Sequence, residues 1–428
     1  MLILGAVALA LTAVLVGLSG RLGPGFGIGA AVIWGVIGLA ALGDAALSLS
    51  RAKSVHVEVA EEVFVGEETR VQLTVSPPPR GLTGKLDIPE GLRGPEEFVF
   101  HPAGGGVTAH VPLTARRRGH WRLTRLWLKW PSRLGLFEFT PVVPLGASLR
   151  VVPNIRLVQS GQITAQVTSS LYGTKDNRAI GEGSEFHQLR DFVPGMDVKS
   201  IDWKRSAHRN ALVAKEQRAE RNHRVIVALD NGYLMREEIA GLPKIDHAIN
   251  AALATAWAAA IGGDLVGFYS YDVKPRDFAA PEPGRLAFAR LRSRTADMDY
   301  VSRSTNHTLA MTELSARSPK RSLIIVFTDF VDTVSAELML ENLRVLARRH
   351  LIIFVTLRDP SLEARVQTAP DDLDGVATVV AAHQALSERH VVLARLQRMG
   401  VSVVDAEPGK VTARLISTYL DIKAREMI

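Results

Sequence analysis

Residues 224–230 read Arg-Val-Ile-Val-Ala-Leu-Asp, a short apolar run that ends at an acidic residue. Similar apolar runs follow at residues 265–271, 323–327 and 351–356. Segments with a helical pattern alternate with these runs, at residues 245–261, 338–349 and 391–399, and residues 401–404 again resemble a strand. Apolar strands that alternate with helices are typical of a parallel sheet covered on both faces. The sequence therefore predicts an α/β domain with a mainly parallel sheet over residues 223–428.

Acidic residues stand where these strands end. Asp230, Asp272 and Asp329 each follow an apolar run directly or within one residue. In open α/β sheets, ligands bind at the carboxyl ends of the strands. We therefore expect this edge of the sheet to face a binding partner.

Upstream of this domain the pattern changes to short strands. Val63, Val65, Val71, Leu73 and Val75 fall on alternating positions, and Pro- and Gly-rich turns follow at residues 77–81 and 104–106. Short strands at this spacing, without a helical period, favour a β-sandwich. We place that domain at residues 51–155 and a polar connecting segment at residues 156–222.

The N-terminus carries two apolar runs, at residues 2–18 and 26–43, with a polar turn at residues 19–25 between them. At about 1.5 Å per residue, each run reaches about 26 Å, close to the thickness of a bilayer core. No basic residue precedes Leu2, so a signal peptide is disfavoured. We predict a transmembrane helical hairpin over residues 1–50, in the bacterial inner membrane. Arg51 and Lys53 after the second run favour cytoplasmic soluble domains.

Composition narrows the chemistry. The 428 residues include 51 Lys and Arg against 44 Asp and Glu, which gives a net charge of +7, and there is no Cys. Without Cys there are no thiol nucleophiles, iron–sulfur clusters or Cys-based zinc sites. The basic excess suits a nucleic acid, an anionic membrane or an acidic protein, and does not decide among them.

One strand-like segment concentrates this charge. Residues 116–133 hold seven basic residues and no acid, with Trp121, Trp127 and Trp130 between them. Such a segment could bind nucleic acid, with indoles stacking on bases and Arg116 to Arg133 holding phosphates. It also fits a half-buried strand with Trp side chains inward and basic stems outward. We favour the second interpretation and expect no nucleic-acid partner.

The densest polar segment lies at residues 181–204, and the chain lacks P-loop, zincin and serine-hydrolase motifs. Glu185, His187, Asp197 and Asp202 could form a metal-dependent hydrolase site. Each of the acids has a basic residue within a few positions, which equally indicates a structural ion-pair network. We therefore assign no catalytic residue.

This segment resembles the signature of the bacterial family known as domain of unknown function 58. The matching residues are Gly183, Glu185, Phe186, Leu189, Arg190, Pro194, Gly195, Asp197, Ile201, Asp202, Trp203 and Arg209. The resemblance implies a partner-binding or structural role for these residues. It also implies a von Willebrand factor A-like domain after the signature and an association with MoxR-type AAA+ ATPases.

Domains of the von Willebrand factor A type often bind Mg²⁺ through an Asp-x-Ser-x-Ser motif, a later Thr and a later Asp. By this resemblance, Asp230, Thr305 and Asp329 match the Asp and Thr positions, whereas Gly232 and Leu234 stand at the two Ser positions. Because two hydroxyl ligands are missing, we expect a degenerate site and no cofactor.

Together these observations predict a membrane-anchored adaptor that binds proteins and is not an enzyme. Its expected partner, implied by the resemblance, is a MoxR-type AAA+ ATPase that acts in the assembly or maturation of other proteins. The alternatives are the hydrolase based on Glu185, His187, Asp197 and Asp202, and a nucleic-acid binder based on residues 116–133.

Overall fold

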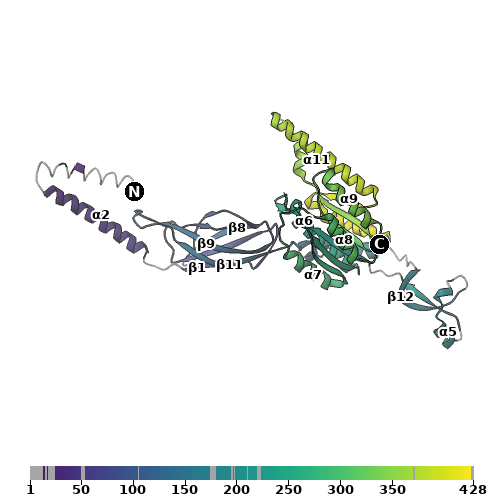
Figure 1. The fold of residues 1–428 in the computed structure, drawn as a ribbon. Helices are drawn as coiled ribbons and strands as arrows, with labels where there is room; N and C mark the ends of the chain where they lie inside the picture. The colour runs from purple at the N-terminus through teal and green to yellow at the C-terminus, as the bar shows by residue number, and fades with distance from the viewer. Residues whose placement is uncertain are drawn as a thin grey trace. The chain divides into compact units, whose positions relative to one another are not determined.

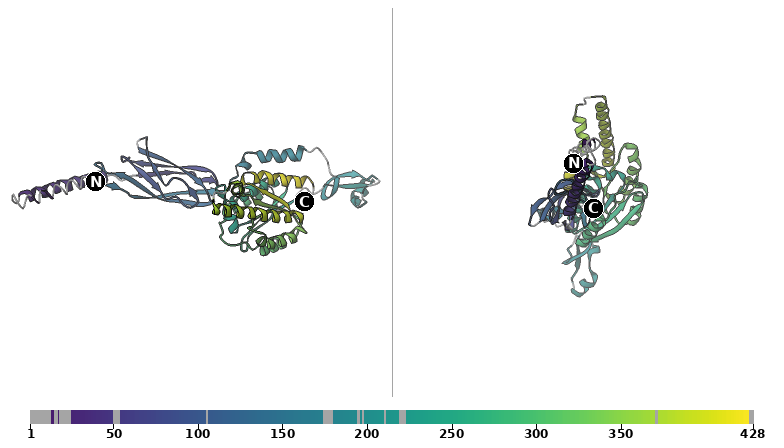
Figure 2. Two further views of the ribbon diagram at one scale, coloured as in Figure 1. Left: turned by 90° about the horizontal axis from the view of Figure 1, so that it is seen from above. Right: turned by 90° about the vertical axis from the view of Figure 1, so that its left-hand side faces the viewer.

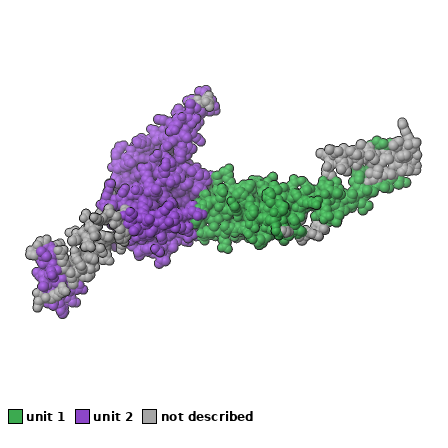
Figure 3. All heavy atoms as spheres, turned by 180° about the vertical axis from the view of Figure 1, so that it is seen from behind, with its two compact units in different colours: residues 1–152 green, residues 153–428 purple. Residues whose placement is uncertain are grey.

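The computed structural model describes residues 13–14, 17, 25–49, 54–104, 106–173, 180–193, 196, 198–209, 211–218, 223–369 and 372–425. The chain divides into two compact units, residues 1–152 and residues 153–428, which Figure 3 colours separately. Each unit has its own strands and its own buried core.

The predicted transmembrane hairpin is wrong. The second apolar run forms the single helix α2 (Gly25–Leu49), and the chain then continues into strands (Figure 1). Within the described part of the chain, no helix has the length and apolar composition needed to cross a bilayer. Most of the first run, residues 2–18, lies outside the described residues.

Polar side chains near the end of α2 show why it differs from a simple membrane span. The Asp44 carboxylate is 3% exposed and accepts the N–H of Leu134 at 3.0 Å. One turn later the Ser48 hydroxyl accepts the N–H of Arg133 at 3.2 Å. The final turns of α2 therefore attach to a loop of the β-structure through hydrogen bonds. A count of apolar residues does not reveal such a contact.

Two sheets build the rest of the first unit. The first has the order β1-β3-β8-β5 with β7 beside β8, and consists of β1 (Ser54–Glu58), β3 (Glu68–Ser76), β5 (Leu92–Arg93), β7 (His101–Ala103) and β8 (Gly106–Ala115). The second has the order β2-β11-β9-β4-β6 with β10 beside β9, and consists of β2 (Glu62–Phe64), β4 (Thr83–Leu86), β6 (Glu97–Val99), β9 (Gly119–Pro131), β10 (Glu138–Phe139) and β11 (Val142–Val152). Their pairings are antiparallel except for the parallel pair β2–β11.

Alternation along the strands defines the core of this unit. Val71, Leu73 and Val75 of β3 are fully buried, while their neighbours along the strand are exposed or half-buried. In β9, Leu123 is buried, but farther along the strand the buried residues are Leu126 and Leu128. The side that points into the core therefore shifts from odd-numbered to even-numbered residues between 123 and 126. The neighbouring strand β11, which pairs with β9 in the same sheet, shows a register shift between Pro144 and Ala147. Such irregularities bend a sheet and redirect side chains.

The second unit contains a six-stranded sheet with the order β18-β17-β14-β19-β20-β21. Its strands are β14 (Arg224–Asp230), β17 (Leu265–Tyr271), β18 (Pro275–Pro283), β19 (Leu323–Phe327), β20 (Leu351–Leu357) and β21 (Ser402–Ala406). The pairings β17–β14, β14–β19, β19–β20 and β20–β21 are parallel, as expected for a mainly parallel sheet. The edge strand β18 differs, because it runs antiparallel to β17 and makes the sheet mixed. The short connection between β17 and β18 permits only a hairpin, since a parallel pair needs a long crossover.

Helices cover both faces of this sheet (Figure 2). One layer contains α6 (Lys244–Ile261), α7 (Gly284–Ala296) and α12 (Pro408–Ala424). The other contains α8 (His307–Arg317), α9 (Thr333–Ala347) and the C-terminal half of α11 (Leu373–Arg398), which follows α10 (Pro360–Gln367). A buried cluster that includes Ile226, Tyr269 and Phe354 joins the sheet to this second layer.

Smaller elements complete the second unit. They are α3 (Arg156–Gln159), α4 (Gln162–Gly173), β12 (Ile180–Asp191), η1 (Val198–Ser200), α5 (Trp203–Arg209), β13 (Val213–Arg218), η2 (Tyr233–Arg236), β15 (Glu238–Ile239) and β16 (Leu242–Pro243). β12 and β13 pair as an antiparallel hairpin, and so do β15 and β16. The signature residues are therefore distributed over the β12–β13 hairpin and the α5 segment between its strands.

Candidate functional site

Polar side chains gather at the carboxyl ends of the parallel strands. Asp230 is the last residue of β14, and Asp329 comes two residues after the end of β19. Thr356 in β20 and Asp405 in β21 lie at the same edge of the sheet. All of these side chains are buried or half-buried, so their contacts decide what this edge can bind.

Two threonine hydroxyls hold Asp230 in place. Thr305 donates to its Oδ1 and Thr328 donates to its Oδ2, both at 2.5 Å. The N–H of Gly232 donates to Oδ1 at 2.8 Å. Burial raises the pKa of Asp230, although a charge on the nearby His307 and the hydrogen bonds act in the opposite direction. Both carboxylate oxygens are therefore already engaged with protein donors.

Two cations hold the second acid, Asp329, which is 4% exposed. The Lys244 ammonium lies 2.6 Å from Oδ2, and the Arg389 guanidinium lies 3.2 Å from Oδ1. The N–H of Phe330 and the Thr356 hydroxyl donate to Oδ1 at 3.0 and 3.1 Å. Asp329 thus has partners on both oxygens.

Arg389 extends this network to β21. It donates to Asp405 and to Thr356 at 2.8 Å, and to the carbonyl of Leu357 at 3.0 Å. Burial acts to lower the pKa of Arg389, but the adjacent carboxylates of Asp329 and Asp405 outweigh it and raise that pKa. Lys244 shows the same balance, since Asp329 and Glu237 raise its pKa against the effect of burial. The buried Lys244 and the half-buried Arg389 are thus both matched by carboxylates.

The residues at this edge do not fit a Mg²⁺ ion. A Cβ on Gly232 would lie 2.0 Å from the Thr305 hydroxyl, so a serine here would have to displace Thr305 from Asp230. Leu234 in η2 offers no side-chain oxygen, and the Lys244 ammonium lies directly against Asp329. A divalent cation needs several free oxygen ligands, and a neighbouring ammonium repels it. Within the described residues, no cluster of three or more His, Asp or Glu has a metal-binding arrangement.

The structure thus brings together Asp230 and Thr305 from the predicted set, and surrounds Asp329 with residues that the sequence did not single out. Lys244 and Arg389 come from helices 85 and 60 residues away from Asp329 in the chain. Neither Lys244 nor Arg389 lies in a recognisable motif. The signal that the sequence offers is the position of Lys244 at the start of a mostly apolar helix. Ion pairs over such distances leave no local pattern in one sequence.

The signature residues that the structure describes lie in β12, in α5 and directly before α5. Gly183, Glu185, Phe186, Leu189 and Arg190 lie in β12, together with His187. Pro194, Gly195 and Asp197 lie outside the described residues. Ile201 is 8% exposed and pairs with Ala214 of β13, and Arg209 is the last residue of α5.

Two signature residues shape the α5 segment. The Asp202 carboxylate accepts the N–H of Arg205 at 3.2 Å, which is the contact of a helix N-cap. Trp203, the next residue, is 66% exposed. Ser206 is buried and donates to and accepts from the backbone of Val213. Asp202 therefore has a local structural contact, and Trp203 offers an apolar surface.

β9 takes up most of the basic segment, and acids from the loop after β4 and from β10 pair with part of this segment. Arg117 contacts Glu90 at 2.6 Å, and Arg125 contacts Asp87 at 2.9 Å. Lys129 contacts Glu138 at 3.1 Å. Trp130 is buried and stacks on Phe139, with ring centroids 5.9 Å apart. These pairs reduce the positive charge that the sequence places on this strand.

An exposed apolar stripe runs along α9, the helix that starts just after Asp329. Val334 is 82% exposed, Leu338 is 62% exposed and Val345 is 63% exposed. Their spacing of four and seven residues places them on one side of the helix. The opposite side buries Ala336, Met339, Leu340, Leu343 and Leu346 against the sheet. Val331, in the loop before α9, is 54% exposed and adds to what we call the α9 stripe.

Comparisons with known proteins give similarity without an assigned activity. Uncharacterized proteins of Mycobacterium bovis and Mycobacterium tuberculosis are 24% identical to this chain over 192 residues, which is 44% of the chain and 60% of each relative. A solved structure described as an uncharacterized membrane spanning protein from Vibrio fischeri matches 48% of this chain and 100% of its own, with 14% identity and a TM-score of 0.18. Residues 188–384 match the family described as protein of unknown function DUF58, which confirms the resemblance for this part of the chain.

Proposed function

We propose that this protein is a binding module for another protein, and that the α9 stripe is its contact surface. The resemblance to the family supplies two further parts of the proposal. The six-stranded domain is of the von Willebrand factor A type, and the partner is a MoxR-type AAA+ ATPase. The protein acts as an adaptor in the assembly or maturation of other proteins.

The observation that carries this proposal is the exposure of the α9 stripe. Single exposed apolar residues are ordinary, but contiguous apolar patches mark interaction sites on soluble domains. Val331, Val334 and Leu338 form such a series, which begins two residues after Asp329. Val345 follows on the same side of the helix, beyond the polar Glu341 and Asn342. Partners of α/β domains bind at this edge of the sheet. The stripe therefore lies where a protein partner would reach both the helix and the strand ends.

The chemistry of the neighbouring strand ends also supports binding over catalysis. The carboxylates of Asp230 and Asp329 have protein donors on both oxygens. The cavity beside Lys244 and Asp329 measures about 10 Å³, which is room for about one water molecule. A substrate would need a larger space and a free reactive group.

A location at the bacterial inner membrane, with the folded units in the cytoplasm, remains part of the proposal. Apolar side chains of α2 support contact with an apolar surface, since Leu39 and Leu42 are 72% and 70% exposed. Separation of cell membranes from cytosol, followed by detection of the chain in each fraction, tests this location. Recovery in the cytosol alone would contradict it.

The test of the partner uses the purified chain and a MoxR-type ATPase from the same host. We expect the two to co-elute in size-exclusion chromatography and the chain to change the rate of ATP hydrolysis. Leu338→Asp places a charge in the α9 stripe. Burying a leucine contributes about 1.5–3 kcal/mol, so this variant should weaken binding by at least about tenfold.

Leu286→Asp is the matched control. Leu286 is 73% exposed, lies in α7 and belongs to the helix layer on the other face of the sheet. The same substitution there should leave binding unchanged. The proposal fails if the wild-type chain neither co-elutes with the ATPase nor affects its rate. Equal loss of binding in both variants would show that the α9 stripe is not the contact surface.

A further inference from the structure

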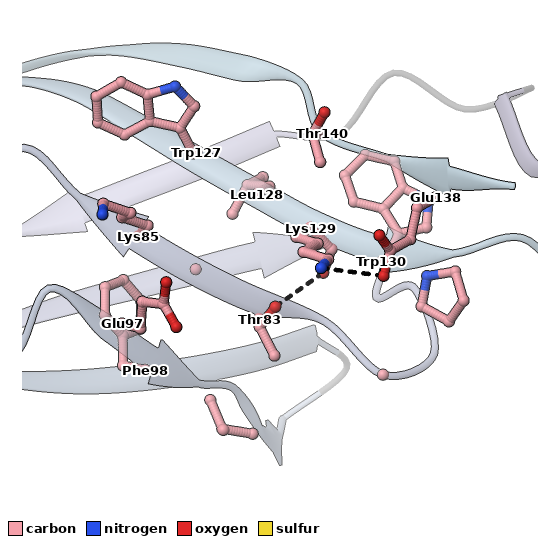
Figure 4. Close-up of a pocket in the computed structure, with 14 residues that line it drawn as sticks. Thr83, Lys85, Glu97, Phe98, Trp127, Leu128, Lys129, Trp130, Glu138 and Thr140 are labelled. Atoms are coloured by element: carbon pink, nitrogen blue, oxygen red, sulfur yellow. Dashed lines mark hydrogen bonds and ion pairs between the residues drawn. The ribbon is translucent and has the colours of Figure 1, made fainter.

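The outer face of the β-structure in the first unit carries a hollow of about 770 Å³, unrelated to the α9 stripe. It lies over β4, β6, β9 and β10, and Figure 4 shows the side chains around it. Its size falls within the range of small-molecule sites. The first unit therefore has space for a ligand about as large as a short oligomer.

Strand register brings an indole and two charged side chains side by side in this hollow. Lys85 of β4 pairs with Trp127 of β9 on one side and with Glu97 of β6 on the other. Residues paired across strands share one face of a sheet. Trp127 thus lies beside Lys85, with Glu97 beyond Lys85, and offers an apolar surface next to these polar side chains (Figure 4).

The indole is supported from outside the hollow. The Arg125 guanidinium lies 5.2 Å from the centre of the Trp127 ring, and Asp87 holds that guanidinium at 2.9 Å. Arg125 is not among the described residues that line the hollow. A cation fixed against one side of an aromatic ring holds the ring in place. The ring is therefore prepared for stacking without a large loss of side-chain freedom.

The charged residues of the lining are equal in number, with Lys85 and Lys129 against Glu97 and Glu138. The Lys85 ammonium is also held at 2.9 Å by Glu96, which lies outside the lining. Lys129 lies 3.1 Å from Glu138, and the Thr83 hydroxyl donates to the Lys129 carbonyl at 3.3 Å (Figure 4). A strongly charged ligand gains no net attraction here. A neutral ligand with many hydroxyl groups finds both donors and acceptors.

We propose that this hollow binds a neutral oligosaccharide. A sugar ring has a flat face of C–H groups that stacks on an indole, and hydroxyl groups around its rim. Trp127 supplies the stacking surface, while Glu97, Glu138 and the lysines supply charge-assisted hydrogen bonds to hydroxyls. A nucleic acid or an anionic lipid would meet the two carboxylates. This site is independent of the proposed protein partner.

The test is calorimetric titration of the chain with cellotetraose, chitotetraose and maltotetraose, three neutral sugars of different linkage. We expect at least one to bind at millimolar concentration or below. Trp127→Ala should weaken that binding by about tenfold, since it removes the stacking surface. Trp34→Ala, which removes a 42% exposed indole from α2, should leave it unchanged.

A second variant keeps the test valid if Trp127→Ala unfolds the sheet. Glu138→Gln preserves shape but removes one charge from the lining, and should also weaken sugar binding. The proposal is overturned if none of the three sugars binds the folded chain, or if both lining variants bind sugar as the wild type does. Binding of single-stranded DNA or anionic vesicles in place of the sugars would equally overturn it.

Discussion

Replacing Lys244 by methionine removes one of the two cations that hold Asp329, and it should destabilise the second unit strongly. The Lys244 ammonium lies 2.6 Å from Asp329, which is 4% exposed, and it also contacts Glu237. At an effective dielectric constant of about 20, two unit charges about 3 Å apart attract by about 5 kcal/mol. Desolvation offsets much of that attraction in the wild type. Removing one partner leaves the desolvated carboxylate behind, so we expect a loss of about 3–5 kcal/mol.

Hydrogen exchange measured by mass spectrometry on α6 peptides checks this value, because it reports unfolding of the second unit separately from the first. Lys410→Met is the control. Lys410 is 73% exposed and contacts Glu407 at 2.9 Å, so its removal should change stability by less than about 0.5 kcal/mol. The double variant Lys244→Met with Asp329→Leu should lose less stability than the sum of the two single losses, since the two charges stabilise each other. It should stay below the wild type, because Asp329→Leu also takes one carboxylate from Arg389.

The reasoning is refuted if Lys244→Met lies within about 0.5 kcal/mol of the wild type. It is also refuted if the double variant shows the sum of the two single losses, because uncoupled losses would mean that the charges do not stabilise each other. If Lys410→Met lost as much stability as Lys244→Met, the effect would come from removing any lysine and not from the contact with Asp329.

Three further predictions concern the same domain. Burial, with a further contribution from Arg349, lowers the pKa of His350 in the folded chain. The unfolded chain therefore takes up a proton at His350 at a higher pH than the folded chain does, and stability falls as the pH drops below about 6.5. In His350→Leu this loss of stability should be smaller, and urea unfolding midpoints at neutral and mildly acidic pH measure it. Thr328→Val removes the donor to one oxygen of the buried Asp230 and should cost about 1–3 kcal/mol in urea unfolding, and a change near zero would contradict the role of this bond. Gly232→Ser adds a Cβ that would lie 2.0 Å from the Thr305 hydroxyl, so Thr305 must move, and the variant should cost about 1–3 kcal/mol. A thermal-shift assay should show no recovery with Mg²⁺, whereas recovery would mean that the edge can be rebuilt as a metal site.

The alternating apolar runs correctly predicted a sheet between helices, because periodicity is a local property. The runs at residues 224–230, 265–271, 323–327 and 351–356 coincide with β14, β17, β19 and β20. The antiparallel edge strand β18 was not predicted, since its half-buried pattern includes Pro275, Pro281 and Pro283, which weaken a strand signal. The N-terminal hairpin was predicted from hydropathy alone, and the contacts of Asp44 and Ser48 with the β-structure show what hydropathy omits.

The sequence by itself predicted β14, β17, β19 and β20 and the strand-end positions of Asp230 and Asp329, because apolar runs and chain order are local properties. It also showed that Gly232 and Leu234 lack the hydroxyl ligands of a metal site. Only the tertiary structure decided what surrounds those acids. Lys244 and Arg389 reach Asp329 from distant helices. Because these groups are removed from water, breaking such a pair costs more than breaking a pair at the surface. Exposure of the α9 stripe and the hollow around Trp127 likewise depends on which faces the fold leaves uncovered, a property of packing that no single stretch of sequence contains.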